Sequence, residues 1–383
     1  MNNATERQAQ HKIYRSAPKS LAFYMSYYGR FTASHAANKK PQNFRKMFEG
    51  IRHYQCHPYK RQISPLESIY KEGEMQVLKV PGNGRSGSGD TYPVPVLFIP
   101  SLINPSTIMD LHPRRSLLRW FSDNKFGSYL VDWGCPQNDK NLYSLNDIIV
   151  ERLIPAIEEV LRIHNSDRIH LAGYCMGGLL SIAASHLLRE KVASLQLLSS
   201  PWNFGINHDH LSRIVIGNLD FLKTSLAQME AVPSIYIQSL FAFIDPYSLV
   251  NRFSDFVEMK VDSFGAELFI AAEEWANGGV NLPAELALDC LEKMYEKNLP
   301  CSGKWYVGGQ NINLQNLNDL PVQIIHPSKD KVVPLESTQE LFKHLHNVNI
   351  LKPQTGHVGI ICGRNAIRDI WTPMIEFAIR NTS

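Results

Sequence analysis

The stretch that decides the fold is IHLAGYCMGGLLSIAASHLL, residues 169–188. It holds no Asp, Glu, Lys or Arg, and its twenty residues are long enough for a membrane-spanning helix. Three glycines crowd its middle, however, and this favours a buried strand over 169–172 that turns sharply into a buried helix from Met176. We therefore expect a strand-turn-helix unit rather than a membrane span.

The turn has the sequence Gly173-Tyr174-Cys175-Met176-Gly177, a G-x-S-x-G elbow in which cysteine replaces serine. Glycine suits both flanks because the sharp turn leaves no room for Cβ atoms. The turn also projects the middle residue over the N-terminus of the helix, where the dipole favours a thiolate. The alternative is a buried structural cysteine, because such a pentapeptide also occurs by chance.

Outward from this unit, short apolar segments alternate with helical ones. Strands are expected at 94–99, 128–131, 195–198, 322–326 and 349–351, and helices at 113–124, 145–164 and 176–188. Buried strands that alternate with amphipathic helices are typical of a mostly parallel sheet with helices on both faces. Between 202 and 318 the alternation stops, which predicts a helical cap inserted into the core.

The expected domains are a basic aromatic N-terminal arm at 1–62, a core at 63–201 and 319–383, and the cap at 202–318. The whole chain has 383 residues, of which 44% are hydrophobic and 20% charged, and this excludes low-complexity chains and small disulfide scaffolds. The arm holds twelve Lys and Arg against two Glu, a net charge of +10, which leaves 27 basic and 34 acidic residues and a net charge of −7 in the rest. Any attraction to anionic surfaces should therefore come from the arm.

Aromatic residues recur within the arm at helix-like spacing. They are Phe23, Tyr24, Tyr27, Tyr28 and Phe31. A helix packed on the body and a helix at an interface between water and an apolar phase both fit this pattern. We expect no nucleic-acid partner, because no recognised nucleic-acid module surrounds the charges.

The six cysteines are scattered without a C-x-x-C pair, and the N-terminus lacks the apolar run of a secretory signal. A reducing cytoplasm is therefore the expected location.

The candidate acid and base follow the elbow in the order of a hydrolase triad. Asp330 comes after the strand at 322–326 and His357 after the strand at 349–351, so both lie where strands end. A turn acid paired with a lysine and a loop histidine are the structural alternatives, and Asp319 is a less well placed competitor. We predict an α/β-hydrolase fold with Cys175, Asp330 and His357 as its catalytic triad.

Two backbone N–H groups are expected to form the oxyanion hole. One belongs to Met176, directly after the nucleophile, and the other to the loop at 102–104, at Ile103.

Several separate motifs carry a family resemblance over roughly residues 60 to 380. They are Leu102-Ile103-Asn104-Pro105 with Met109-Asp110-Leu111, Val131-Asp132-Trp133-Gly134, the Gly-x-Cys-x-Gly-Gly box at 173–178, Asp330 with Val333-Pro334, and Gly356-His357-Val358-Gly359. On these motifs the chain resembles the polyhydroxyalkanoate synthases, which include the poly(3-hydroxybutyrate) synthases. Its short length and residues 110–117 look most like classes III and IV, while Trp275, 281–283 and Asn298 are similar to the cap of class I. Family members have an aspartate-histidine pair where this chain has Asp330-Lys331, which marks a divergent branch.

The resemblance implies an acyltransferase that moves 3-hydroxyacyl groups from coenzyme A onto a growing polyester chain through acyl-Cys175, without a metal or redox cofactor. It also implies that the chain works at a polyester granule surface, as a homodimer or with a second synthase subunit. His357 would serve as the base, and Asp330 would orient His357 or act on the 3-hydroxyl.

Two other functions stay open. A cysteine hydrolase of the same fold, either an intracellular polyester depolymerase or an acyl-CoA thioesterase, would use the same triad with water as the acceptor. A non-catalytic protein of the granule surface would retain the fold without a reactive cysteine.

Overall fold

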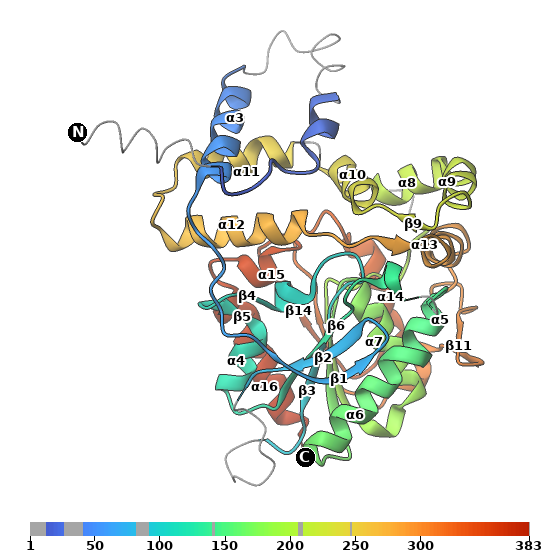
Figure 1. Cartoon of the computed structure of the whole chain (residues 1–383). Coiled ribbons are helices and arrows are strands. Elements are labelled where there is room, and N and C mark those ends of the chain that lie inside the picture. Colours follow the sequence, from blue (N-terminus) through green and yellow to red (C-terminus); the bar gives the residue numbers. More distant parts are fainter. Residues whose placement is uncertain are drawn as a thin grey trace. The chain divides into compact units, whose positions relative to one another are not determined.

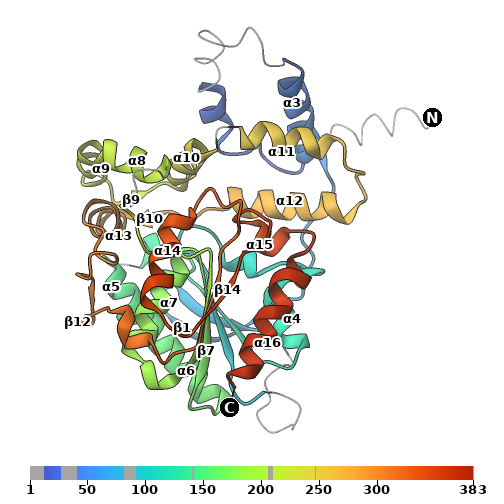
Figure 2. The same cartoon turned by 180° about the vertical axis from the view of Figure 1, so that it is seen from behind.

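A computed structural model describes residues 13–26, 41–81, 92–139, 142–205, 210–245 and 247–382 (Figures 1 and 2). Contacts divide the chain into two compact units: Met1–Gln62 with Ile235–Gly279, and Ile63–Ser234 with Val280–Ser383. The expected boundaries near 62, 202 and 318 stay a prediction. Tyr27, Tyr28 and Phe31 lie outside the described residues.

The larger unit is built on an eight-stranded sheet with the order β1-β2-β6-β3-β7-β8-β13-β14. Its strands are β1 (Glu67–Glu72), β2 (Met75–Lys79), β3 (Val96–Ile99), β6 (Ser128–Asp132), β7 (Ile169–Tyr174), β8 (Val192–Leu198), β13 (Val322–Ile325) and β14 (Val348–Leu351). Strand β2 pairs antiparallel with β1 and β6, and the pairs from β6 to β14 are parallel. Because the strands from β3 to β13 are buried on both faces, they consist of nearly continuous apolar residues.

Helices cover both faces of this sheet. They are α4 (Leu117–Asp123), α6 (Ile154–His164), α7 (Met176–Leu187), α14 (Leu335–His344) and α16 (Thr372–Arg380). Figures 1 and 2 show α4 and α16 on one side of the sheet and α6 and α7 on the other. The predicted mostly parallel sheet with helices on both faces is confirmed.

Two expected helices differ from the prediction. The helix expected at 113–124 begins only at Leu117, because residues before it form the short hairpin β4 (Asp110–His112) and β5 (Arg115–Ser116). Ser116 caps this helix by accepting a hydrogen bond from the backbone N–H of Arg119 at 3.0 Å. The helix expected at 145–164 runs through α5 (Leu145–Asp147) and a π-helical turn at Ile148–Leu153 before α6, whose second residue, Pro155, has no N–H to donate.

Between β8 and β13 the larger unit adds small elements outside the sheet. They are α8 (His210–Gly217), α9 (Leu219–Leu226), α13 (Ala284–Cys290), the π-helical turn η5 (Leu291–Glu296), the pair β9 (Ala231–Val232) and β10 (Leu282–Pro283), the pair β11 (Tyr306–Val307) and β12 (Gln310–Asn311), the 3-10 turn η6 (Leu314–Leu317) and, after β14, α15 (Gly359–Cys362).

The smaller unit is helical. It contains α3 (Pro41–Cys56), α11 (Ser248–Val257), α12 (Phe264–Asn277) and nearly all of α10 (Ser234–Ile244). Tyr24 and Tyr54 are buried in its apolar core together with side chains from α11 and α12. A Cβ on Gly50 would overlap the carbonyl of Phe253, so α3 and α11 approach each other closely at this point.

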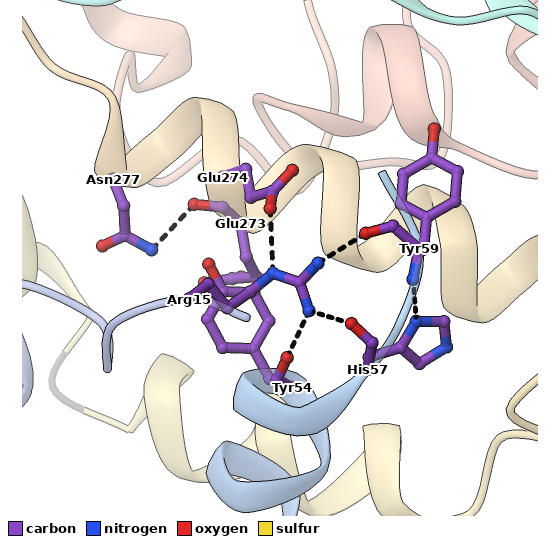
Figure 3. A network of polar contacts seen from close by, with 7 residues as sticks. All are labelled: Arg15, Tyr54, His57, Tyr59, Glu273, Glu274 and Asn277. Atoms are coloured by element: carbon purple, nitrogen blue, oxygen red, sulfur yellow. Dashed lines mark hydrogen bonds and ion pairs between the residues drawn. The ribbon is translucent and has the colours of Figure 1, made fainter. Parts of the chain in front are cut away.

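One arginine ties the N-terminal segment of this unit together (Figure 3). The guanidinium of Arg15 donates to the carbonyls of Tyr54, His57 and Tyr59 at 2.6 to 2.7 Å, and it pairs with Glu274 at 2.8 Å. Three of its four partners are therefore backbone acceptors at and just after the end of α3, where carbonyls lack partners within the helix.

Among the described residues, no helix is long and apolar enough to cross a membrane. The uncharged stretch at 169–188 is divided between β7 and α7, as the strand-turn-helix prediction requires.

Candidate active site

Cys175 stands alone between the end of β7 and the start of α7. Its backbone has φ 55° and ψ −125°, a left-handed conformation that is unfavourable for a residue with a side chain. Its N–H donates to the carbonyl of Leu198 at 2.8 Å, and its own carbonyl accepts from Gly178 at 2.9 Å. These bonds hold the turn against β8 and against the first turn of α7.

The flanking glycines are required by close backbone packing. A Cβ on Gly177 would overlap the carbonyl oxygen of Ile99 at the end of β3. A Cβ on Gly173 would lie 2.5 Å from the Cα of Gly178. The two glycines predicted from the elbow motif therefore allow β3, β7 and α7 to meet at one point.

His357 and Asp330 lie together at the same end of the sheet. Asp330 follows β13, His357 follows β14, and the two strands are parallel neighbours. The Nδ1 of His357 bonds with Oδ2 of Asp330 at 2.8 Å, and the side chains are 11% and 0% exposed. The other carboxylate oxygen accepts from the N–H groups of Val332 and Val333 at 2.8 and 3.0 Å, which fixes the plane of the carboxylate.

A side-chain hydrogen bond also joins His357 to Cys175. The structure thus brings the three residues of the predicted triad together. The predicted competitor Asp319 instead pairs with Arg189 at 2.8 Å, and its side chain is 77% exposed.

Charge dominates the environment of His357. Burial alone would lower its pKa, but the charges of Asp330 and Cys175, with the hydrogen bonds from both, outweigh burial and raise the pKa to about 10. Burial alone would raise the pKa of Asp330. The charge of the adjacent His357 and its hydrogen bond outweigh burial, so the pKa of Asp330 lies below its ordinary value. The imidazolium and the carboxylate therefore stabilise each other as an ion pair.

Tyr174 is a site residue that the sequence pattern missed. Its ring lies against the imidazole of His357, with centroids 5.1 Å apart, and its hydroxyl donates to the carbonyl of His357 at 3.5 Å. Burial raises its pKa well above the ordinary value, so the hydroxyl stays protonated. No motif marks this position because the elbow tolerates any residue there.

Of the two predicted oxyanion donors, Met176 belongs to the elbow itself and Ile103 to a separate loop. Met176 is the first residue of α7, and the N–H groups of a first turn have no partner within their helix. Ile103 belongs to the loop after β3, and its carbonyl accepts from the N–H of Val280 at 3.2 Å. Trp133, from the predicted Asp-Trp-Gly motif, holds the same loop by donating to the carbonyl of Pro100 at 3.0 Å.

Ser199 and His326 also border the site and were not predicted. Each is buried and directly follows a strand, β8 and β13 respectively. The Ser199 hydroxyl is among the groups that lower the pKa of Asp330. Burial lowers the pKa of His326, and the charge of the Asp330 carboxylate partly opposes this effect. Their position at strand ends was the available signal, but short polar residues are common there.

Within the described ranges, no group of three or more His, Cys, Asp or Glu side chains is arranged to hold a metal ion.

Comparison with known proteins identifies the fold family of the chain. A family model described as alpha/beta hydrolase fold matches residues 94–363. In the solved structures, DcsB in complex with its substrate analogue aligns with a TM-score of 0.50 at 13% identity, covering 83% of this chain and 99% of that one. This likeness concerns the fold alone.

Curated relatives are similar in sequence. The poly(3-hydroxyalkanoate) polymerase subunit PhaC of Haloferax mediterranei is 27% identical over 82% of this chain and 63% of its own length. The protein of the same name from Allochromatium vinosum is 24% identical over 82% of this chain and 87% of its own. The chain thus spans less than two thirds of the first relative, and the predicted family resemblance is confirmed.

Proposed function

Because the chain belongs to the alpha/beta hydrolase fold family, whose model matches residues 94–363, we propose that it uses the nucleophile position of this fold for acyl transfer. The proposed activity is that of a poly(3-hydroxyalkanoate) polymerase, which extends a polyester with 3-hydroxyacyl groups from coenzyme A. The observation that supports it most is the hydrogen-bonded series Cys175, His357 and Asp330 at the elbow of a chain similar to such polymerases over 82% of its length.

In the first half-reaction, the Cys175 thiolate attacks the thioester carbonyl. The developing oxyanion is stabilised by backbone N–H groups, for which Met176 and Ile103 are the proposed donors. The C–S bond to coenzyme A then breaks, and the departing thiolate takes the proton held by His357. The acyl group remains on Cys175 as a thioester, so its reactivity is conserved.

In the second half-reaction, the now neutral His357 accepts the proton of the hydroxyl at the end of the polyester. That oxygen attacks the acyl carbonyl, an ester bond forms and the Cys175 thiolate leaves, which restores the ion pair with His357. Asp330 stabilises the imidazolium and keeps Nδ1 of His357 turned toward itself, so that Nε2 faces the reacting groups.

The raised pKa of His357 fits these roles. With a pKa of about 10, His357 is protonated in the resting site and can deliver a proton to coenzyme A without a separate acid. A serine at the elbow would need His357 as a base from the start, whereas a thiolate is already charged.

The test is incubation of the purified wild type and Cys175→Ala with 3-hydroxybutyryl-CoA. Thiol release should fall by about 10³-fold or more in the variant, and the wild type should deposit insoluble polyester. Cys301→Ala is the matched control, because Cys301 belongs to the same unit and the charged residues that act on it, Glu340 and Lys343, lie in α14 rather than in the elbow.

The product separates the alternatives. Cys175-dependent release of soluble 3-hydroxybutyrate would replace the polymerase by a hydrolase with the same nucleophile. Equal release from the wild type and Cys175→Ala would contradict the nucleophile itself. The partners expected alongside this activity are the polyester surface in the cytoplasm and either a second copy of the chain or a second synthase subunit.

A further inference from the structure

Two buried polar side chains beside Asp330 take no part in the proposed mechanism. Ser199 is fully buried and His326 is 4% exposed. In the described part of the chain, no atom lies at hydrogen-bond distance and angle from Oγ of Ser199 or from Nδ1 of His326. Buried polar atoms are nearly always bonded, so two such atoms at one place require an explanation.

The sheet places these residues next to each other. Leu198 of β8 pairs with Ile325 of β13 in parallel register, so Ser199 and His326 are the next residues on neighbouring strands. The N–H of Ser199 donates to the carbonyl of Ile325 at 2.9 Å, which continues the pairing beyond the strand ends. Neighbouring strands lie about 4.8 Å apart, and Ser199, with φ 48°, turns out of the extended conformation directly after β8.

Both residues also lie near the carboxylate of Asp330. The Ser199 hydroxyl is close enough to Asp330 to help lower the pKa of its carboxyl, although the two groups do not have the distance and angle of a hydrogen bond. After burial, the charges nearby affect the pKa of His326 in both directions. Asp330 and Glu336 raise it, and Lys352 and His357 lower it. Burial is the largest influence on His326 and lowers its pKa, which favours the neutral imidazole.

Asp330 has one acceptor site left for such a neighbour. A carboxylate offers about four lone-pair sites. Two N–H groups occupy Oδ1 and His357 occupies one site on Oδ2. A second donor to Oδ2 would complete the set, and a neutral imidazole and a hydroxyl can pass such a bond along.

We propose that His326 and Ser199 form a hydrogen-bonded chain that ends on the Asp330 carboxylate and positions it against His357. Nδ1–H of His326 donates to Oγ of Ser199, and Oγ–H of Ser199 donates to Oδ2 of Asp330. Both are positioning residues, since they act through Asp330 and do not touch the reacting atoms. The inference rests on the proposed function, in which Asp330 is the acid of the triad.

The chain of bonds has a measurable consequence at Cys175. A donor on the carboxylate stabilises its charge, the charge stabilises the His357 imidazolium, and the imidazolium stabilises the thiolate. Removing the donor should make the thiolate less abundant near neutral pH. The readout is the rate of Cys175 alkylation by iodoacetamide as a function of pH, which needs no acyl substrate.

In Ser199→Ala and His326→Leu, we expect the midpoint of alkylation to rise by about one pH unit, the size of one lost bond to a charged group. The double variant should shift no further than Ser199→Ala, because the two residues act in series. His326→Asn keeps an N–H donor near the position of Nδ1, so its alkylation midpoint should return most of the way to that of the wild type. If Ser199→Ala fails to fold, the comparison of His326→Leu with His326→Asn still decides the matter.

The matched control is Ser185→Ala. Ser185 lies in α7, is fully buried, and its hydroxyl also lacks a partner among the described residues. It should leave the midpoint unchanged. Unchanged midpoints in Ser199→Ala and His326→Leu, or an equal shift in Ser185→Ala, would overturn the proposal.

The experiment separates this inference from the proposed function. Shifted midpoints in a protein that forms no polyester would keep the positioning chain and reject the polymerase. Unshifted midpoints in a protein that forms polyester through Cys175 would reject the hydrogen-bonded chain of His326 and Ser199 but not the polymerase.

Discussion

Cys175 keeps a side chain where the backbone favours glycine. A conformation with φ 55° and ψ −125° costs a residue with a Cβ about 1–3 kcal/mol. In return the thiol projects from the turn toward His357, with which it forms a hydrogen bond. The strain is thus part of the arrangement that the proposed reaction needs.

This strain predicts an unusual stability order. Cys175→Gly should be more stable than Cys175→Ala by about 1 kcal/mol, because both lose the thiol and only glycine relaxes the backbone. Chemical denaturation of the two variants measures the difference. At Ser181, in the middle of α7, the order should reverse, with glycine about 1 kcal/mol less stable than alanine. An alanine variant as stable as the glycine variant at 175 would contradict the strained conformation.

The ion pair of His357 and Asp330 predicts a pH dependence of stability. The pKa of His357 is about 10 in the folded chain and about 6.5 as the unfolded reference. Its stabilisation is therefore complete below about pH 6.5 and is lost as pH rises toward 10, at up to about 1.4 kcal/mol per pH unit. The lowered pKa of Asp330 has the opposite sign: its contribution is present above about pH 4 and is lost in more acidic solution.

Denaturation of the wild type and His357→Gln between pH 6 and 10 tests this. The free energy of unfolding should fall more steeply with pH in the wild type than in the variant. His344→Gln, which removes an exposed histidine of α14, should keep the slope of the wild type. Parallel curves for the wild type and His357→Gln would show that the pair contributes no such stability.

At the scale of the element, the elbow depends on backbone contact between β3 and α7. Gly177→Ala places a methyl group against the carbonyl of Ile99, and overpacking of this kind costs about 1–3 kcal/mol. Gly265→Ala, in α12, meets nothing closer than 3.9 Å and should gain up to about 1 kcal/mol from helix propensity. Thermal unfolding of both variants gives the signs, and a Gly177→Ala variant as stable as the wild type would contradict the close approach.

The elements that could be predicted are those whose own sequence carries the pattern. β7 and α7 follow from the uncharged stretch and its glycines, and Asp330 and His357 follow from strand ends in hydrolase order. Strand β1 was not predicted because it is largely exposed, and β2 was not predicted because only Met75 and Val77 in it are buried, so neither has the apolar run of a buried strand. Tyr174, Ser199 and His326 were not predicted because they meet the site through contacts between segments far apart in the sequence, which no local spacing encodes.

On the scale of the whole molecule, the chain contains two units, and their cores can be tested separately. Arg15 belongs to the smaller unit, where its side chain is 8% exposed and bonds three carbonyls around the end of α3. Arg15→Ala leaves these acceptors without their partner and should destabilise the smaller unit by about 3 kcal/mol. Hydrogen exchange should accelerate in α3 and α11, whereas β7 and β13 in the other unit should exchange as in the wild type.

The control for this prediction is Lys46→Ala. Lys46 pairs with Glu258 in the same unit, but both side chains are more than half exposed, so the variant should exchange like the wild type. Equal acceleration in β7 and in α3 after Arg15→Ala would mean that the two units unfold as one.

The central claim is that Cys175 carries the acyl group during transfer. Intact-protein mass spectrometry after rapid quenching of the wild type with 3-hydroxybutyryl-CoA tests it most directly, followed by peptide mapping of the adduct. The account predicts a 3-hydroxybutyryl adduct on the peptide that contains Cys175, present in Cys301→Ala and absent in Cys175→Ala. An adduct that persists in Cys175→Ala, or turnover of the wild type with no adduct on this peptide under any quench, would contradict it.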